Sequence, residues 1–221
     1  MFDDKTADPS PTVIYRVVGT LANVTAILTD TAMMKALKAG AVKRLTTLLE
    51  PEQNSSPQLI VKVLNALGNL SLQEQAKTPI IEADAVPLII ECIANAIKSD
   101  ETDPRIRRYG SAALLSLSVH EKCKVQLQDP FAVHTLCRLL YVRVPDEAHT
   151  RSNAVSIIHH VSEAPMGLTV YCTQLVEDDQ LTLEVFAERA GAPLVELLSG
   201  ESSEQRGFAV RAIHTLLAAS T

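Results

Sequence analysis

The sequence contains no tryptophan, and aromatic residues make up only 4% of it, so its core has to be built from Leu, Ile, Val and Ala. Such side chains suit layers of packed helices. No stretch approaches the ~20 apolar residues that a transmembrane helix needs. The longest near-continuous apolar run, residues 86–97, is interrupted by Glu91 and Asn95. The first residues are acidic and polar, which fits neither a secretory leader nor, with Phe2, a myristoylation site. We therefore expect no membrane span.

Motifs of several enzyme classes are also missing, namely a Gly-rich phosphate loop, a GxSxG elbow and an HExxH helix. The four cysteines form no CxxC pair, so we expect free thiols in a reducing compartment, the cytoplasm, with the nucleus as the alternative. The runs HEKC and HTLC each pair a histidine with a cysteine, but helical core packing explains Cys123 and Cys137. We expect no metal site, no cofactor and no enzymatic activity.

The formal net charge of −6 argues against wholesale binding to nucleic acid or to an anionic membrane. The distribution of the charges along the chain carries more information than their sum.

What the sequence does contain is a recurring helix pattern, seen most clearly in residues 58–71. Four of its polar side chains, Gln58, Lys62, Asn65 and Asn69, recur at steps of four, three and four, which places them in one narrow stripe along a helix. Everything else before Ser71 is apolar. A helix that exposes only one narrow polar stripe to solvent is packed between neighbours, as the middle element of a stack.

The same stripe returns along the chain. The apolar residue after its last position recurs at intervals of 46, 47, 44 and 55 residues, as Val24, Leu70, Leu117, Val161 and Leu216. A period of this length predicts a helical solenoid. A second marker, the segments 39–50, 83–93, 130–140 and 189–199, precedes each later stripe helix and supports the same period.

The repeat makes residues 12–221 one unit. We expect residues 1–11 to be a disordered lead-in or the edge of a longer chain. An irregular insertion covers 163–182, where the period lengthens, and it is either a surface loop or a segment that contacts a partner. The expected helices are 12–28, 30–40, 41–49, 58–71, 74–83, 86–97, 105–118, 121–127, 130–142, a stripe helix ending at 162, and one over 206–218.

These units resemble armadillo repeats, which consist of three helices in ~42 residues. The residues that carry the resemblance are AGAVKRLTTLL and ADAVPLIIECI for the second helix, with TLANVT, ALGNLS and ALLSLS for the third. The resemblance implies an all-α, right-handed superhelical solenoid of about four repeats preceded by a lone third helix. It also implies a concave groove in which Asn23 and Asn69 hydrogen-bond the backbone of an extended peptide.

One departure from the family narrows the expectation. Nuclear-import receptors carry a Trp four residues before the groove Asn, whereas this sequence has Gly19 and Asn65 at those positions. Recognition of a nuclear localisation signal is therefore not expected.

The stripe helices carry no Asp or Glu, although an even spread of the acids would place roughly eight there. Their charged residues are basic, which predicts a positive trough that binds an extended acidic or phosphorylated segment of a partner protein. Close packing of the helices would also leave such a surface poor in acids, so a purely structural origin stays open. We expect the partner-binding residues to be Arg16, Asn23, Lys62, Asn65, Asn69, Arg105, Arg108, Tyr109, Ser116, Asn153, His160 and Arg211.

The predicted protein is thus a non-enzymatic interaction scaffold, monomeric or part of a larger chain. The alternative is a helical-repeat protein that binds single-stranded RNA, which would need stacking rings along the groove.

Overall fold

The computed structural model of the chain describes residues 10–25, 30–53, 55–98, 102–140 and 148–162. Over these residues the protein is all-helical and contains no strand. The elements are α1 (Pro11–Thr25), α2 (Asp30–Lys38), α3 (Ala41–Thr47), a 3-10 turn η1 (Pro51–Gln53), α4 (Pro57–Ser71), α5 (Glu74–Glu82), α6 (Ala85–Lys98), α7 (Pro104–Leu117), α8 (Glu121–Gln126), α9 (Pro130–Leu139) and α10 (Ala148–Ser162).

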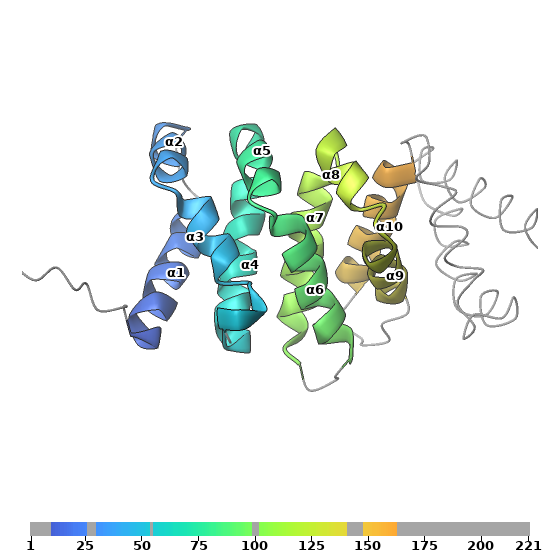
Figure 1. Cartoon of the computed structure of the whole chain (residues 1–221), viewed down its shortest axis with the longest axis horizontal. Helices are drawn as coiled ribbons and strands as arrows, with labels where there is room; N and C mark the ends of the chain where they lie inside the picture. Colours follow the sequence, from blue (N-terminus) through green and yellow to red (C-terminus); the bar gives the residue numbers. More distant parts are fainter. Residues whose placement is uncertain (1–9, 26–29, 54, 99–101, 141–147, 163–221) are drawn as a thin grey trace, which may run out of the picture.

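Four long helices, α1, α4, α7 and α10, form one layer in which each helix packs against the next in chain order (Figure 1). A second layer consists of α3, α6 and α9, which pack onto α4, α7 and α10, and the short helices α2, α5 and α8 lie along one border of the row. The helices predicted from the stripe pattern are therefore neighbours in space. The predicted helix over 206–218 lies outside the described residues.

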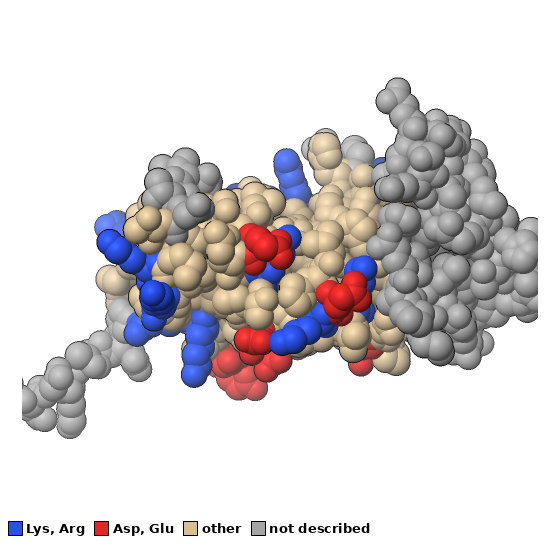
Figure 2. All heavy atoms as spheres, turned by 90° about the horizontal axis from the view of Figure 1, so that it is seen from above, with Lys and Arg blue, Asp and Glu red and all other residues tan. Residues whose placement is uncertain are grey.

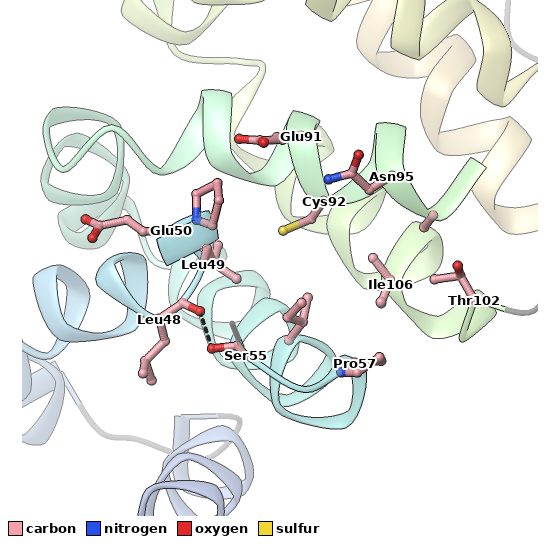
Figure 3. A pocket seen from close by; sticks show the side chains of 13 residues that line it. Leu48, Leu49, Glu50, Ser55, Pro57, Glu91, Cys92, Asn95, Thr102 and Ile106 are labelled. Atoms are coloured by element: carbon pink, nitrogen blue, oxygen red, sulfur yellow. Dashed lines mark hydrogen bonds between the residues drawn. The ribbon is translucent and has the colours of Figure 1, made fainter. Parts of the chain in front are cut away.

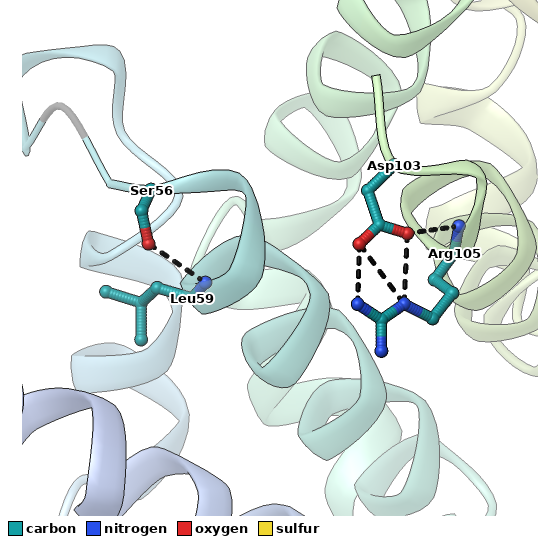
Figure 4. Close-up of polar contacts among 4 residues, drawn as sticks. All are labelled: Ser56, Leu59, Asp103 and Arg105. Atoms are coloured by element: carbon teal, nitrogen blue, oxygen red, sulfur yellow. Dashed lines mark hydrogen bonds and ion pairs between the residues drawn. The ribbon is translucent and has the colours of Figure 1, made fainter. Parts of the chain in front are cut away.

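Helix starts follow the sequence signals for capping. The hydroxyl of Ser56 accepts a hydrogen bond from the backbone N–H of Leu59 at 3.3 Å, and Asp103 accepts one from the backbone N–H of Arg105 at 3.0 Å (Figure 4). Asp129 caps α9 in the same way. A proline follows each of these caps, at the first helical position where its missing N–H costs nothing.

The turn between the short and the second helix requires a left-handed backbone. Gly40 joins α2 to α3 with φ 77°, and Asp84 joins α5 to α6 with φ 56°. Glycine adopts this conformation without strain and Asp is one of the few other residues that tolerate it. The same turn is thus built twice, 44 residues apart, with the expected glycine in one copy and an aspartate in the other.

The core is continuous along the row. On α4, the side chains of Leu59, Val63, Leu64, Leu67 and Leu70 are buried. Lys62, Asn65 and Asn69 are half-buried and Gln58 is exposed, so the narrow polar stripe is confirmed. Gly19 occupies the position in α1 that Asn65 occupies in the polar stripe of α4, but it is buried under the side chain of Lys62, so the stripe does not continue through this position of α1.

Predicted and observed helix bounds agree closely, with small differences at the ends. The helix predicted for residues 12–28 runs from Pro11 to Thr25, and residues 26–29 lie outside the described part. The helix predicted for 130–142 ends at Leu139. The predicted insertion, 163–182, also lies outside the described residues.

Candidate functional site

The candidate site is the polar edge, defined here as the predicted partner-binding residues on α1, α4, α7 and α10. Those four helices, over their observed bounds, contain neither Asp nor Glu. Arg16, Asn23, Arg105 and Arg108 are exposed. The half-buried members are Lys62, Asn65, Asn69, Tyr109, Ser116, Asn153 and His160. Arg211 lies outside the described residues.

Lys62 is a half-buried cation of the polar edge that contacts the neighbouring helix α1. Its ammonium nitrogen lies 4.6 Å from the centroid of the Tyr15 ring, in α1, a cation–π distance. A Cβ atom added to Gly19 would come within 2.8 Å of the same nitrogen. The absence of a side chain at Gly19 therefore lets Lys62 lie across α1, where Tyr15 holds it. No ion pair to Lys62 occurs among the described residues.

Arg105 is less available to a ligand because Asp103 engages it directly. Its guanidinium donates to the Asp103 carboxylate with nitrogen–oxygen distances of 2.6, 3.0 and 3.1 Å (Figure 4). The side-chain hydrogen bond from Arg105 holds the pKa of Asp103 below its usual range. The same contact raises the pKa of Arg105. The phenols of Tyr109 and Tyr15 add smaller contributions to Arg105 in the same direction.

Two polar-edge side chains hydrogen-bond the preceding helix. Nδ2 of Asn69 donates to the carbonyl oxygen of Ala22 at 2.9 Å, and Oγ of Ser116 donates to the carbonyl oxygen of Ser71 at 2.7 Å. Both acceptors lie in the last turn of a helix, where carbonyls lack intrahelical donors. These side chains therefore join α1 to α4 and α4 to α7.

Asn153 and His160 continue the pattern one helix further along. Asn153 donates from Nδ2 to the Ser111 hydroxyl at 3.1 Å, and Nδ1 of His160 lies 2.7 Å from the Ser118 hydroxyl. Among the described polar-edge residues, Asn23 and Asn65 are the asparagines that make no such bond. Neither Ser111 nor Ser118 was predicted to take part.

Three further arginines of the long layer differ in their surroundings. Arg16 and Arg108 are exposed, and neither forms an ion pair with a described acid. Arg107 is buried and donates to the carbonyl oxygen of Ala96 at 2.6 Å. It ties α7 to the end of α6 and belongs to the fold.

Three acidic side chains on the short helices α5 and α8 pair with lysines. Glu74 pairs with Lys77, Glu121 with Lys124, and Glu82 with Lys122 across α5 and α8. The acids within described α-helices therefore lie on the short helices α2, α5 and α8 and on α6, whereas the long layer contains none and neither do α3 and α9. Figure 2 shows the acids over the middle of the row and basic side chains gathered at the α1–α3 end.

A pocket of about 220 Å³ opens between the second-layer helices and the starts of α4 and α7 (Figure 3). The hydroxyl of Ser55 at its wall donates to the carbonyl oxygen of Leu48 at 2.7 Å. The lining residues are Leu48, Leu49, Glu50, Pro51, Ser55, Pro57, Ile60, Glu91, Cys92, Asn95, Ala96, Thr102 and Ile106.

The pocket does not hold an activated nucleophile. Burial raises the pKa of the Cys92 thiol to about 12, and the charge of Glu91 adds to the effect. A thiol with such a pKa stays protonated at neutral pH and is unreactive.

Metal ligands do not converge in the described part of the chain. His120 caps α8, with Nδ1 accepting from the backbone N–H of Lys122 at 3.3 Å, and its Nε2 lies 3.3 Å from the Thr78 hydroxyl. Cys123 is buried with a free thiol. Over the described residues there is no group of three side chains suited to a metal ion, and no helix is long and apolar enough to cross a bilayer.

Sequence reasoning missed Tyr15, which contributes the ring beside Lys62. The signal was present, because Tyr15 lies one residue before a stripe position, on the side of the helix that turns toward the next stripe helix. A helical wheel that included the neighbours of each stripe would have identified it.

No model of a known protein family matches this sequence, and no curated protein matches it. The functional assignment therefore depends on the residues and their geometry.

Proposed function

We propose that this protein is a non-enzymatic interaction scaffold, an armadillo-type solenoid whose polar edge binds an extended acidic or phosphorylated segment of a partner protein. The single observation that carries the proposal is the acid-free layer formed by α1, α4, α7 and α10, with Lys62 held in place on its surface.

The arrangement of contacts supports the solenoid. Polar side-chain contacts between elements recur at sequence separations of 47, 45 and 42 residues, as in Asn69 with Ala22, Ser116 with Ser71, and Asn153 with Ser111. Each contact joins one helix of the long layer to the next. Contacts that recur near the period of the sequence are those that a stack of similar units would make.

The charges support an anionic ligand. Arg16, Lys62 and Arg108 belong to the polar edge, and no described acid pairs with them. Guanidinium and ammonium groups bind carboxylates and phosphates through charge-assisted hydrogen bonds, which are stronger than neutral ones. Lys62 has already lost rotational freedom against Tyr15, so less ordering is needed when an anion binds.

The asparagines contribute unequally to this proposal. The Nδ2 donor of Asn69 bonds to the protein itself, as does that of Asn153. Asn23 and Asn65 are the amides available to the backbone of a ligand. Affinity would therefore come mainly from the acidic side chains or phosphates of the segment.

The test uses a fluorescein-labelled twelve-residue glutamate peptide and a phosphoserine peptide of the same length. The double variant Arg16→Glu with Lys62→Glu is compared with Lys43→Glu, an exposed charge reversal on α3, in the second layer. We expect the double variant to weaken binding at least about tenfold, and Lys43→Glu to have little effect. Circular dichroism checks that both variants keep their helices.

Equal affinity of the double variant and the parent protein would refute the proposal. Tight binding of single-stranded oligouridine at physiological salt, lost in the same double variant, would instead favour the RNA-binding alternative.

A further inference from the structure

The outer face of α1 carries an apolar stripe that is exposed. Val13, Val17 and Val24, spaced four and seven residues apart, lie on one side of the helix and are 49%, 59% and 38% exposed. The residues of α1 that pack toward α4, including Val18 and Ala22, are buried. The exposed valines therefore face away from the row.

The equivalent positions in the next two helices of the long layer are all buried. Val17 corresponds to Val63 in α4, which is 0% exposed, and to Gly110 in α7, which is also buried. The other two valines correspond to the buried pairs Leu59 with Ile106 and Leu70 with Leu117. Only the first helix leaves this face uncovered among α1, α4 and α7.

What covers this face in α7 is defined by the structure. A Cβ atom added to Gly110 would lie 2.8 Å from Cγ1 of Ile93 in α6, and one added to Gly68 in α4 would lie 3.8 Å from Cβ of Ala113. The face is therefore closed by two helices, α6 and α4, through aliphatic and small side chains. The same face of α1 fits the apolar side of a helix.

The charge of the α1–α3 end of the row favours an acidic partner helix. Between residues 10 and 49 the sequence contains one acid, Asp30, against five basic residues, Arg16, Lys35, Lys38, Lys43 and Arg44. All five basic side chains are exposed. Figure 2 shows basic side chains collected at this end of the row. A polar outer surface is what ends a stack of repeats in solution, and α1 presents valines instead.

We propose that the outer face of α1 docks an amphipathic helix of a partner protein, apolar on the face that meets Val13, Val17 and Val24 and acidic on its flanks. This surface is separate from the polar edge and does not depend on the function proposed above. The helix would take the place on α1 that α4 and α6 take on α7, with its acids opposite the basic end of the row.

The test is a titration of the full chain with a labelled eighteen-residue synthetic helix, Leu and Ile on one face and Glu on the flanks, followed by fluorescence anisotropy. The same peptide with Lys in place of Glu reports the charge requirement. Val17→Asp is the test variant. Val125→Asp is the matched control, because Val125 on α8 is also exposed, at 67%. The charge reversal Lys62→Glu separates this surface from the polar edge.

We expect Val17→Asp to weaken binding of the Glu-flanked helix at least about tenfold, with Val125→Asp and Lys62→Glu unchanged. The Lys-flanked helix should bind more weakly to the parent protein. Equal binding to the Val17→Asp variant overturns the proposal. So does a dimer in sedimentation that Val17→Asp dissociates, since a second copy would then cover the face. Binding seen only after removal of residues 1–9 overturns the proposal as well, because residues 1–9 of the intact chain would then be what covers the valines.

Discussion

Asn69 and Ala22 are 47 residues apart in sequence, and a 2.9 Å hydrogen bond from the side-chain Nδ2 to the backbone oxygen joins them. The Thr25 hydroxyl donates to the same carbonyl at 2.9 Å, so both lone pairs of a helix-end oxygen are used. Ser116 repeats the arrangement against Ser71, the last residue of α4. A polar residue at this position thus stabilises the end of the preceding helix.

The first prediction concerns this bond. Asn69→Ala should lower the free energy of unfolding by about 1 kcal/mol, because a net hydrogen bond between two helices is lost. Asn23 occupies the same stripe position in α1 but is exposed and makes no described side-chain bond. Asn23→Ala should therefore change stability by less than about 0.5 kcal/mol. Urea unfolding followed by circular dichroism measures both, and equal effects of the two substitutions would contradict the structural role of Asn69.

The sequence predicted the helices well and the use of their polar residues poorly. Periodicity identified the stripe through Lys62 and Asn69, since burial on the other faces leaves a pattern in the residue types. The same pattern cannot say whether an amide meets solvent or a neighbouring carbonyl. That depends on the offset between adjacent helices, which packing determines. Ser111 and Ser118, the partners of Asn153 and His160, were missed for this reason.

The left-handed turns at Gly40 and Asp84 differ in how readily the sequence predicts them. The left-handed turn at Gly40 was predictable because glycine favours it. The same turn at Asp84 was visible only by aligning one repeat with the next, since aspartate rarely adopts positive φ. The burial of Gly19 could not be predicted from the sequence for a different reason. The side chain that covers it, Lys62, belongs to another helix.

The second prediction separates binding from stability at Gly19. An added methyl group would meet only the end of the Lys62 side chain, which can move. Alanine is favoured over glycine inside a helix by about 1 kcal/mol, which offsets the lost contact of Lys62 with Tyr15. Gly19→Ala should therefore leave the unfolding midpoint close to that of the parent protein, while displacing Lys62 and weakening binding of the glutamate peptide severalfold. Unfolding curves and anisotropy on one preparation check both.

Gly110→Ala is the control for this prediction. The added Cβ would lie 2.8 Å from Cγ1 and 3.0 Å from Cδ1 of Ile93, inside the core between α6 and α7. Overpacking of a core costs about 1–3 kcal/mol, and the helix preference of alanine recovers only part of this. Gly110→Ala should therefore destabilise the protein without a specific effect on peptide binding. If Gly19→Ala destabilised the protein as much as Gly110→Ala does, the Lys62 side chain would be unable to move away from the added methyl group.

The third prediction is a pH dependence from Asp103, the cap of α7. Its pKa is lower in the folded protein than in the unfolded chain, chiefly through the hydrogen bond from Arg105. Its contribution to stability is therefore present above the unfolded value of about 4 and is lost as the pH falls through the folded value. Asp103→Ala should cost about 1 kcal/mol at pH 7, as for other helix caps. The difference in free energy of unfolding between Asp103→Ala and the parent protein should be smaller at pH 3, as measured by urea unfolding.

Arg105→Ala tests the cause of that dependence. The variant keeps the cap, because the hydrogen bond at 3.0 Å comes from the backbone N–H of residue 105, but it removes the guanidinium. Asp103→Ala should then show a smaller pH dependence in the Arg105→Ala background than in the parent. A deficit that stays constant from pH 7 to pH 3 in both backgrounds would mean that Asp103 acts without its charge.

The fourth prediction concerns the thiols of Cys92 and Cys123, which sit in α6 and α8. Burial raises the pKa of each to about 12. At pH 8 such a thiol is ionised in about 1 molecule in 10,000, whereas a free cysteine with a pKa of about 8.5 is roughly one quarter ionised. Both should therefore resist iodoacetamide in the native protein and react readily in urea, as measured by mass spectrometry of the labelled peptides. Val125→Cys supplies an exposed thiol on the same fold as a positive control. If Cys92 were alkylated as fast as that control, the interface between α6 and the start of α4 would have to open frequently, and the pocket beside it would be larger than 220 Å³ for part of the time.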